Sequence, residues 1–251
     1  MNKLYKTKQI FIIILIIIIV VAIFISIKPK KESATKENGT PVAEEIKPVE
    51  LCYYRTNKTS SEFYDIAWIK LSILGDKITG EFRNLPAESD SKIGTFEGTV
   101  GPLEQKIMGR RANVWWDSRA EGMEVKEELE IIFGDGSATV GFGEMVDRGD
   151  GVYLYKDKTN LYYIDGMWQM GCEDLDEKLF TEKYIRENIK TVATNKPVLG
   201  GSWYVISVMV NSTTNTGDVV FEDGHIQSKA NFTYTYEENP QNITVTKFEI
   251  K

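Results

Sequence analysis

An uncharged apolar run near the N-terminus constrains this chain more than any other feature. Residues 10–27 carry no charge, and Ser26 is the one hydroxylated side chain among these 18 residues. A helix of that length rises about 27 Å at 1.5 Å per residue, close to the ~30 Å hydrocarbon core of a bilayer. The run therefore predicts a transmembrane helix at residues 10–27, which would hold the chain in a lipid bilayer after a head of residues 1–9.

A cleaved signal peptide is the competing interpretation of this run. Signal peptides have shorter apolar regions that end in a small-residue cleavage site, whereas Ile27 leads directly into Lys28. Three lysines lie on each flank of the run, so lysine counting does not decide its orientation. A helix this near the N-terminus ordinarily acts as an uncleaved export signal. We therefore expect a single-pass protein of the cell membrane, with its head in the cytoplasm and the soluble region outside it.

The residues after this run have the composition of a tether followed by an acidic domain. Residues 28–50 are rich in Lys, Glu, Pro, Ser and Thr, which predicts a disordered segment without a core. Residues 1–31 hold six of the 30 basic residues and none of the 37 acidic ones, so the remainder carries a net charge of −13. Such a charge repels phosphate backbones and anionic lipid surfaces, and we expect no nucleic-acid partner.

Alternating apolar and polar residues dominate residues 51–172. Ile69, Leu71 and Ile73 fall on one face of a strand, and Gly75-Asp76 then supplies a turn into a second alternating strand. Further strands are expected at residues 94–100, 112–117, 129–133, 137–142 and 151–156. About seven short antiparallel strands predict a β-barrel or a sandwich, and the pattern leaves both open.

The apolar period becomes helical over residues 173–194. Asp174 and Glu177 resemble a capping box at the start of this segment, and Pro197 follows its end. We predict one amphipathic linker helix whose charged face is exposed to solvent. Strand patterns return after it and predict a small antiparallel β module at residues 198–251, so the fold class is mainly β.

Cys52 and Cys172 are the only cysteines, and they bracket the first β region. In an exported protein the simplest use of two cysteines is a disulfide between them. Two buried thiols are the alternative.

Several glycine-containing segments of the first β region carry a family resemblance. They are residues 75–80 (Gly-Asp-Lys-Ile-Thr-Gly), 92–98 (Lys-Ile-Gly-Thr-Phe-Glu-Gly), 120–122 (Ala-Glu-Gly) and 141–144 (Gly-Phe-Gly-Glu). With them, residues 65–145 resemble the calycin-like β-barrels of uncharacterised bacterial envelope lipoproteins and membrane-anchored proteins. The resemblance implies a barrel in the cell envelope and brings no catalytic residues. A lipobox cysteine is missing from this sequence, which implies attachment through residues 10–27 instead.

An acidic segment beside two tryptophans is the best candidate for a site. Trp115, Trp116, Asp117 and Glu121 combine an aromatic platform with carboxylates, a pairing suited to glycan binding or cleavage. The alternative is that the acids alternate outward along a strand while one Trp packs inward. The single histidine, His225, follows Asp223-Gly224 and is explained by a hairpin turn.

No phosphate loop, dinucleotide fingerprint or metal-ligand motif is present, so we expect neither a cofactor nor a metal. The Arg-Gly-Asp at residues 148–150 is interpreted as part of a charged turn. The sequence thus favours a non-enzymatic envelope protein that binds a small ligand, a glycan or another protein. The alternative is an envelope hydrolase that uses the acidic patch around Glu121.

Overall fold

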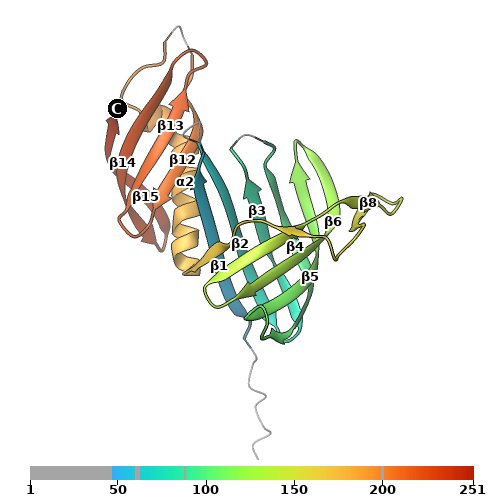
Figure 1. The fold of residues 1–251 in the computed structure, drawn as a ribbon. Helices are drawn as coiled ribbons and strands as arrows, with labels where there is room; N and C mark the ends of the chain where they lie inside the picture. The colour runs from blue at the N-terminus through green and yellow to red at the C-terminus, as the bar shows by residue number, and fades with distance from the viewer. Residues whose placement is uncertain (1–46, 60–62, 88, 199–200) are drawn as a thin grey trace, which may run out of the picture. The chain divides into compact units, whose positions relative to one another are not determined.

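A computed structural model describes residues 47–59, 63–87, 89–198 and 201–251. The predicted head, the predicted transmembrane helix and the tether up to residue 46 lie outside this part of the chain. Among the described residues, no helix is both long and apolar enough to cross a bilayer. The described chain is mainly β, with two sheets and the helix α2 (Cys172–Val192), as Figure 1 shows.

Eight strands of the first sheet close into a barrel, which confirms one of the two predicted architectures and excludes the sandwich. β1 to β7 pair antiparallel in sequence order, and β11 then pairs with both β7 and β1. The ring is formed by β1 (Val49–Lys58), β2 (Tyr64–Leu74), β3 (Lys77–Leu85), β4 (Lys92–Glu104), β5 (Gly109–Ala120), β6 (Met123–Gly134), β7 (Ser137–Phe142) and β11 (Met167–Met170). Three short strands lie outside it: β8 (Met145–Asp147), β9 (Val152–Tyr155) and β10 (Tyr162–Tyr163).

The barrel core is made by the alternating residues that the sequence pattern picked out. Ile69 and Leu71 of β2 point inward and join one cluster with the inward residues of the other ring strands. Gly94 and Gly98 also occupy interior positions of β4, where a Cβ would lie 2.1 Å and 2.2 Å from backbone oxygens of β5. Glycine is therefore required where these two strands approach each other, and the ring of the buried Phe96 lies against Gly80 of β3, where a Cβ would be 2.5 Å from its Cζ.

The predicted disulfide between Cys52 and Cys172 is confirmed, with an S–S distance of 2.17 Å and a Cα–Cα distance of 5.2 Å. Cys52 was expected before the first strand but lies within β1, on its outer face. The bond therefore fastens the wall of the barrel to the first residue of α2. Lys70 of β2 and Asp176 of α2 add an ion pair of 2.7 Å beside it.

The start of α2 differs from the predicted capping box. Gly171 is the N-cap residue and provides no side-chain hydrogen bond, so the box built on Asp174 and Glu177 is wrong. The physical reason is that β11 ends at Met170 and the disulfide fixes Cys172, so the helix begins before those side chains could cap it.

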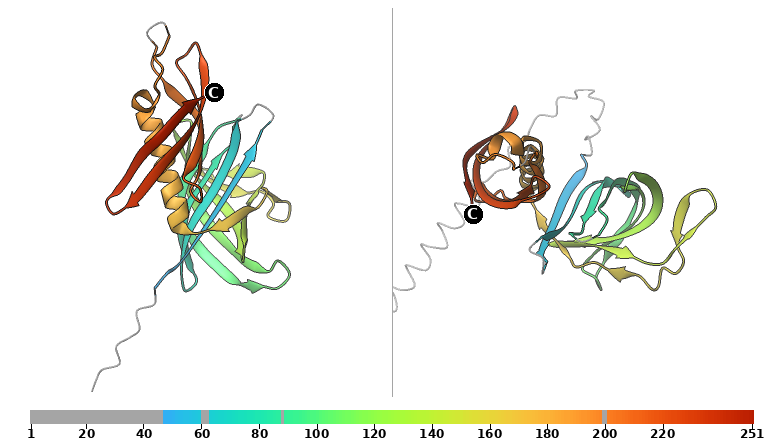
Figure 2. Two further views of the ribbon diagram at one scale, coloured as in Figure 1. Left: turned by 90° about the vertical axis from the view of Figure 1, so that its left-hand side faces the viewer. Right: turned by 90° about the horizontal axis from the view of Figure 1, so that it is seen from above.

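The C-terminal residues form the predicted small antiparallel module. Its strands follow sequence order: β12 (Tyr204–Asn211), β13 (Thr216–Glu222), β14 (Gln227–Glu238) and β15 (Gln241–Ile250). Figure 2 shows this sheet curving around α2. Ile185 and Ile189 of the helix are buried in one cluster with Val208, Phe221 and Phe232 of the sheet. The helix thus supplies part of the core of the module.

The charged face of α2 was expected to be solvated, and for two residues this is wrong. Lys178 is 5% exposed, donates a hydrogen bond from Nζ to the carbonyl oxygen of Val210, and lies 4.5 Å from the centre of the Tyr54 ring. The side chain of Glu182 is 12% exposed, with Oε1 3.8 Å from Lys178 Nζ. Burial raises the pKa of Glu182 to about 7, although Lys178 opposes the shift.

We predict that Glu182 makes stability fall as the pH rises from about 5 to about 7.5. In the folded protein the carboxyl keeps its proton up to a pKa of about 7, whereas the unfolded chain releases it near the ordinary value. Unfolding therefore releases a proton in this interval and becomes more favourable as the pH rises. The effect reaches roughly 3 kcal/mol at ~1.4 kcal/mol per pKa unit. Denaturant unfolding across this range should show a flatter profile for Glu182→Gln, and equal slopes would contradict the assignment.

We also predict that the disulfide contributes a large part of the stability. It closes a loop with a sequence separation of 120, for which the chain-entropy model gives about 5 kcal/mol. The Cys52→Ser, Cys172→Ser double variant should melt well below the oxidised protein and together with the reduced protein. A melting temperature that does not change on verified reduction would show that packing alone holds β1 against α2.

Candidate functional site

The candidate residues of β5 are divided between the two faces of the barrel wall. Trp116 points inward and is fully buried, whereas Trp115 and Asp117 point outward. Glu121 is exposed in the turn between β5 and β6, with a φ of 48°. The structure therefore brings Trp115 and Asp117 to one surface and separates Trp116 from both.

Trp116 belongs to an aromatic and charged cluster inside the barrel. Its ring centre lies 4.9 Å from that of Phe82 and 5.1 Å from Lys92 Nζ, and Lys92 forms an ion pair with the buried Glu127. The indole nitrogen of Trp116 is buried and has no hydrogen-bond acceptor among the described residues. This cluster lies where β4 begins, at one end of the ring.

Asp117 lines a groove of about 650 Å³ on the outer face of β4, β5 and β6. Lys126 Nζ lies 3.0 Å from an oxygen of Asp117 on its floor, and Asp150 and Gly151 of the Arg-Gly-Asp turn form part of its rim. Two segments singled out in the sequence thus meet at this groove. Its lining combines four acids and two cations with apolar side chains, and this mixture favours no particular class of ligand.

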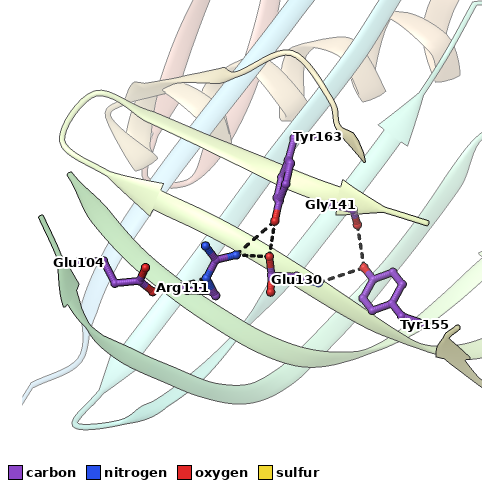
Figure 3. A network of polar contacts seen from close by, with 6 residues as sticks. All are labelled: Glu104, Arg111, Glu130, Gly141, Tyr155 and Tyr163. Carbon is purple, nitrogen blue, oxygen red and sulfur yellow. Dashed lines mark hydrogen bonds and ion pairs between the residues drawn. The ribbon is translucent and has the colours of Figure 1, made fainter. Parts of the chain in front are cut away.

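Figure 3 shows a buried carboxylate with several polar partners on the outer wall. Glu130 is buried and accepts hydrogen bonds from Arg111 Nη1 and from the hydroxyl of Tyr163. Arg111 Nη1 also lies 3.2 Å from that hydroxyl, and its Nε lies 3.4 Å from Oε1 of Glu104. Burial, followed by the hydrogen bond to Glu130, raises the pKa of Tyr163. These contacts hold β10 against the barrel wall.

Tyr155 completes the network at the point where β6 and β7 separate. The ladder between these strands ends at the pair Glu130 and Gly141. There the Tyr155 hydroxyl accepts the backbone N–H of Glu130 at 3.2 Å and donates to the Gly141 oxygen at 2.7 Å (Figure 3). Burial raises the pKa of Tyr155, which keeps the hydroxyl protonated and able to donate. The network of Figure 3 thus bridges β6 and β7 beyond the end of their ladder and holds β9 and β10 against the barrel wall.

A second groove, which the sequence did not indicate, carries an exposed tryptophan. Trp168 of β11 is 71% exposed and pairs with Tyr54 of β1. The groove beside it has a volume of about 520 Å³, and its lining includes Arg55, Asn57, Asp165 and Gln169. An exposed indole next to planar polar side chains fits a sugar, because the aromatic face packs on ring C–H groups while the polar groups bond hydroxyls.

Arg55 gives this groove a fixed cation. Its side chain is 13% exposed, and Nη1 lies 3.4 Å from both the backbone oxygen and Oδ2 of Asp165. Nε is buried and has no hydrogen-bond acceptor in the part of the chain that the structure describes. The buried Nε is out of reach of a ligand, but the guanidinium as a whole lines the groove, and its terminal nitrogens can bind hydroxyl or carboxylate oxygens there.

The other candidates from the sequence have structural explanations. The backbone N–H groups of His225 and Ile226 donate to Oδ1 of Asp223 at 2.9 Å and 2.8 Å, which forms the predicted turn between β13 and β14. Among the described residues, no group of three or more His, Cys, Asp or Glu side chains is placed to hold a metal ion.

Comparison with known proteins gives no family for this chain. No protein-family model matches the sequence, and neither the curated proteins nor the solved structures contain a significant match. The barrel is shown by its strand pairing, and the resemblance to calycin-like envelope proteins stays a prediction.

We predict that Tyr155→Phe destabilises the barrel by about 1–3 kcal/mol, because it leaves a buried N–H and a buried carbonyl oxygen without their shared partner. Denaturant unfolding measures this loss. Tyr162→Phe is the matched control, since Tyr162 is well exposed and should change stability little. Equal effects of the two substitutions would show that the bridge from the Tyr155 hydroxyl to β6 and β7 does not stabilise the barrel.

Proposed function

We propose that this protein is a non-enzymatic, membrane-anchored binding protein of the cell envelope, with a glycan as its ligand. The anchor is the apolar segment at residues 10–27, and the barrel and the C-terminal module stand outside the cytoplasm. The glycan binds in the groove that contains Trp168.

The exposure of Trp168 is the observation that carries this proposal. Trp168 is 71% exposed, so the folded protein does not gain the free energy that burial of its large apolar ring would give. The same short strand places its neighbour Met167 in the barrel core, so the chain presents the indole to solvent while keeping the strand closed. A ligand that covers the ring would recover this free energy, and the groove beside Trp168 supplies polar partners for it.

The apolar sequence supports the membrane anchor, and the disulfide supports the location of the β domain outside the cytoplasm. The apolar run has the length of a bilayer core. Disulfides persist in oxidising compartments and are rare in the cytosol, and the bond between Cys52 and Cys172 therefore supports an extracytoplasmic location.

The alternative function, an envelope hydrolase centred on Glu121, has weaker structural support. Trp116 lies inside the barrel and cannot form an aromatic platform beside Glu121, which is exposed in a turn. Trp115 and Asp117 remain on the outer wall as candidates for binding.

The test uses the full-length chain in detergent and soluble peptidoglycan fragments as the glycan probe. We expect binding without turnover, measured by calorimetry and by chromatography of the mixture. Trp168→Ala should weaken binding by about tenfold or more, which corresponds to ~1.4 kcal/mol. Trp115→Ala is the matched control, because it removes a tryptophan from a different part of the outer wall.

Three outcomes would count against the proposal. If Trp168→Ala binds the fragments as well as the unmodified chain and Trp115→Ala binds them more weakly, the binding site is the acidic segment of β5 and not the groove at Trp168. Cleavage of the fragments that disappears in Glu121→Gln would establish the hydrolase. No binding by the unmodified chain would remove peptidoglycan as the ligand.

A further inference from the structure

The turn between β4 and β5 exposes apolar side chains that the fold does not use. Leu103 is 68% exposed and Met108 is 81% exposed, one on each side of the turn. Neither belongs to a hydrophobic cluster formed by the described residues. The strands on both sides of the turn already bury their inward-facing residues in the barrel core. The fold therefore does not need the apolar side chains at the tip of the hairpin.

The backbone conformation at position 108 is also unfavourable for methionine. Its φ is 47°, in the left-handed region that favours glycine or asparagine. Solvent exposure and backbone conformation both disfavour a long apolar side chain at this position. The stability of the isolated fold therefore does not explain why position 108 is a methionine. A contact between its side chain and a partner outside the fold would explain it.

The apolar turn lies at the end of the barrel from which the chain leads toward the anchor segment. β1 begins there at Val49, and Leu74 ends β2 beside it, because Val49 pairs with Ile73. Val49 and Leu74 are both exposed. Figure 1 shows the start of β1 and the β4–β5 turn at the same end of the barrel.

The charges of the turn differ from those of the whole domain. The chain beyond residue 31 is acidic overall, but Lys106 at the tip is exposed and Arg110 follows it. The acid of the turn, Glu104, lies 3.4 Å from Arg111. Leu103 and Met108, with Lys106 and Arg110 beside them in the sequence, therefore suit the boundary between lipid headgroups and acyl chains, whereas Val49 and Leu74 lie near Glu50 and Asp76.

We propose that Leu103 and Met108, with Val49 and Leu74 at the same end of the barrel, dock this end on the lipid surface to which the protein is anchored. This inference rests on the proposed anchor at residues 10–27. The composition of residues 28–48 predicts a tether, and a flexible chain of 21 residues has a root-mean-square span of about 25 Å, which would allow the barrel end to reach the bilayer. A contact that is weak by itself then suffices, because the tether keeps its effective concentration high.

Oxidation of methionines in the anchored protein tests the docking. The full chain is reconstituted in vesicles of phosphatidylethanolamine and phosphatidylglycerol and treated with chloramine-T, an anionic oxidant that stays in water. Met123, 65% exposed at the start of β6 and at the opposite end of the ring, is the internal control. We expect Met108 to be oxidised several-fold more slowly than Met123, as measured by mass spectrometry. Leu103→Asp should bring Met108 up to the rate of Met123.

Flotation of the same vesicles separates this inference from the proposed anchor. Equal oxidation of the two methionines in protein that floats with the vesicles would overturn the docking and keep the anchor. Protein that does not float would remove the anchor and the docking with it. Protection of Met108 in native membranes alone would assign the turn to a protein partner and would overturn the lipid contact.

Discussion

The barrel depends on the four-residue strand β11, because this strand joins β1 to β7 and completes the hydrogen-bonded ring. Without it, β1 and the first residues of β7 would be open edges with unpaired backbone groups. Met167 fills the core, Gln169 accepts the N–H of Gly136 through its side chain, and Met170 packs beside Cys52. Trp168 therefore stands on a strand that the fold cannot lose, and its position is as fixed as the ring itself.

The sequence predicted the regular part of this fold and missed the part that closes it. Alternation identifies β2 and β3 because their polar and apolar residues face different environments along the whole length. β11 lacks that signal, because Met167-Trp168-Gln169-Met170 is only four residues long and its outward residues, Trp168 and Met170, are apolar. The choice between barrel and sandwich depends on this pairing of distant residues, and a local pattern does not contain it.

The candidate site was predictable only in part, for a similar reason. Adjacent residues of a strand face opposite sides of the sheet. Trp115 and Trp116 are neighbours in the sequence, but Trp115 faces the outside of the barrel and Trp116 lies in its core. Lys178 and Glu182 have the spacing of a solvated helical ion pair, and their burial comes from Tyr54 and Val210, which are remote in the chain. The exposure of Trp168 likewise depends on the packing of residues that are distant in the sequence.

The disulfide also determines how mechanical force would travel through the molecule. A pull applied between the residues before Val49 and the C-terminal sheet passes along β1 only as far as Cys52, crosses the sulfur–sulfur bond and enters α2 at Cys172. The 119 residues between the two cysteines form a closed covalent loop outside this path. The barrel would therefore carry little of the load, and its groove would keep its shape while the two ends of the chain are under tension.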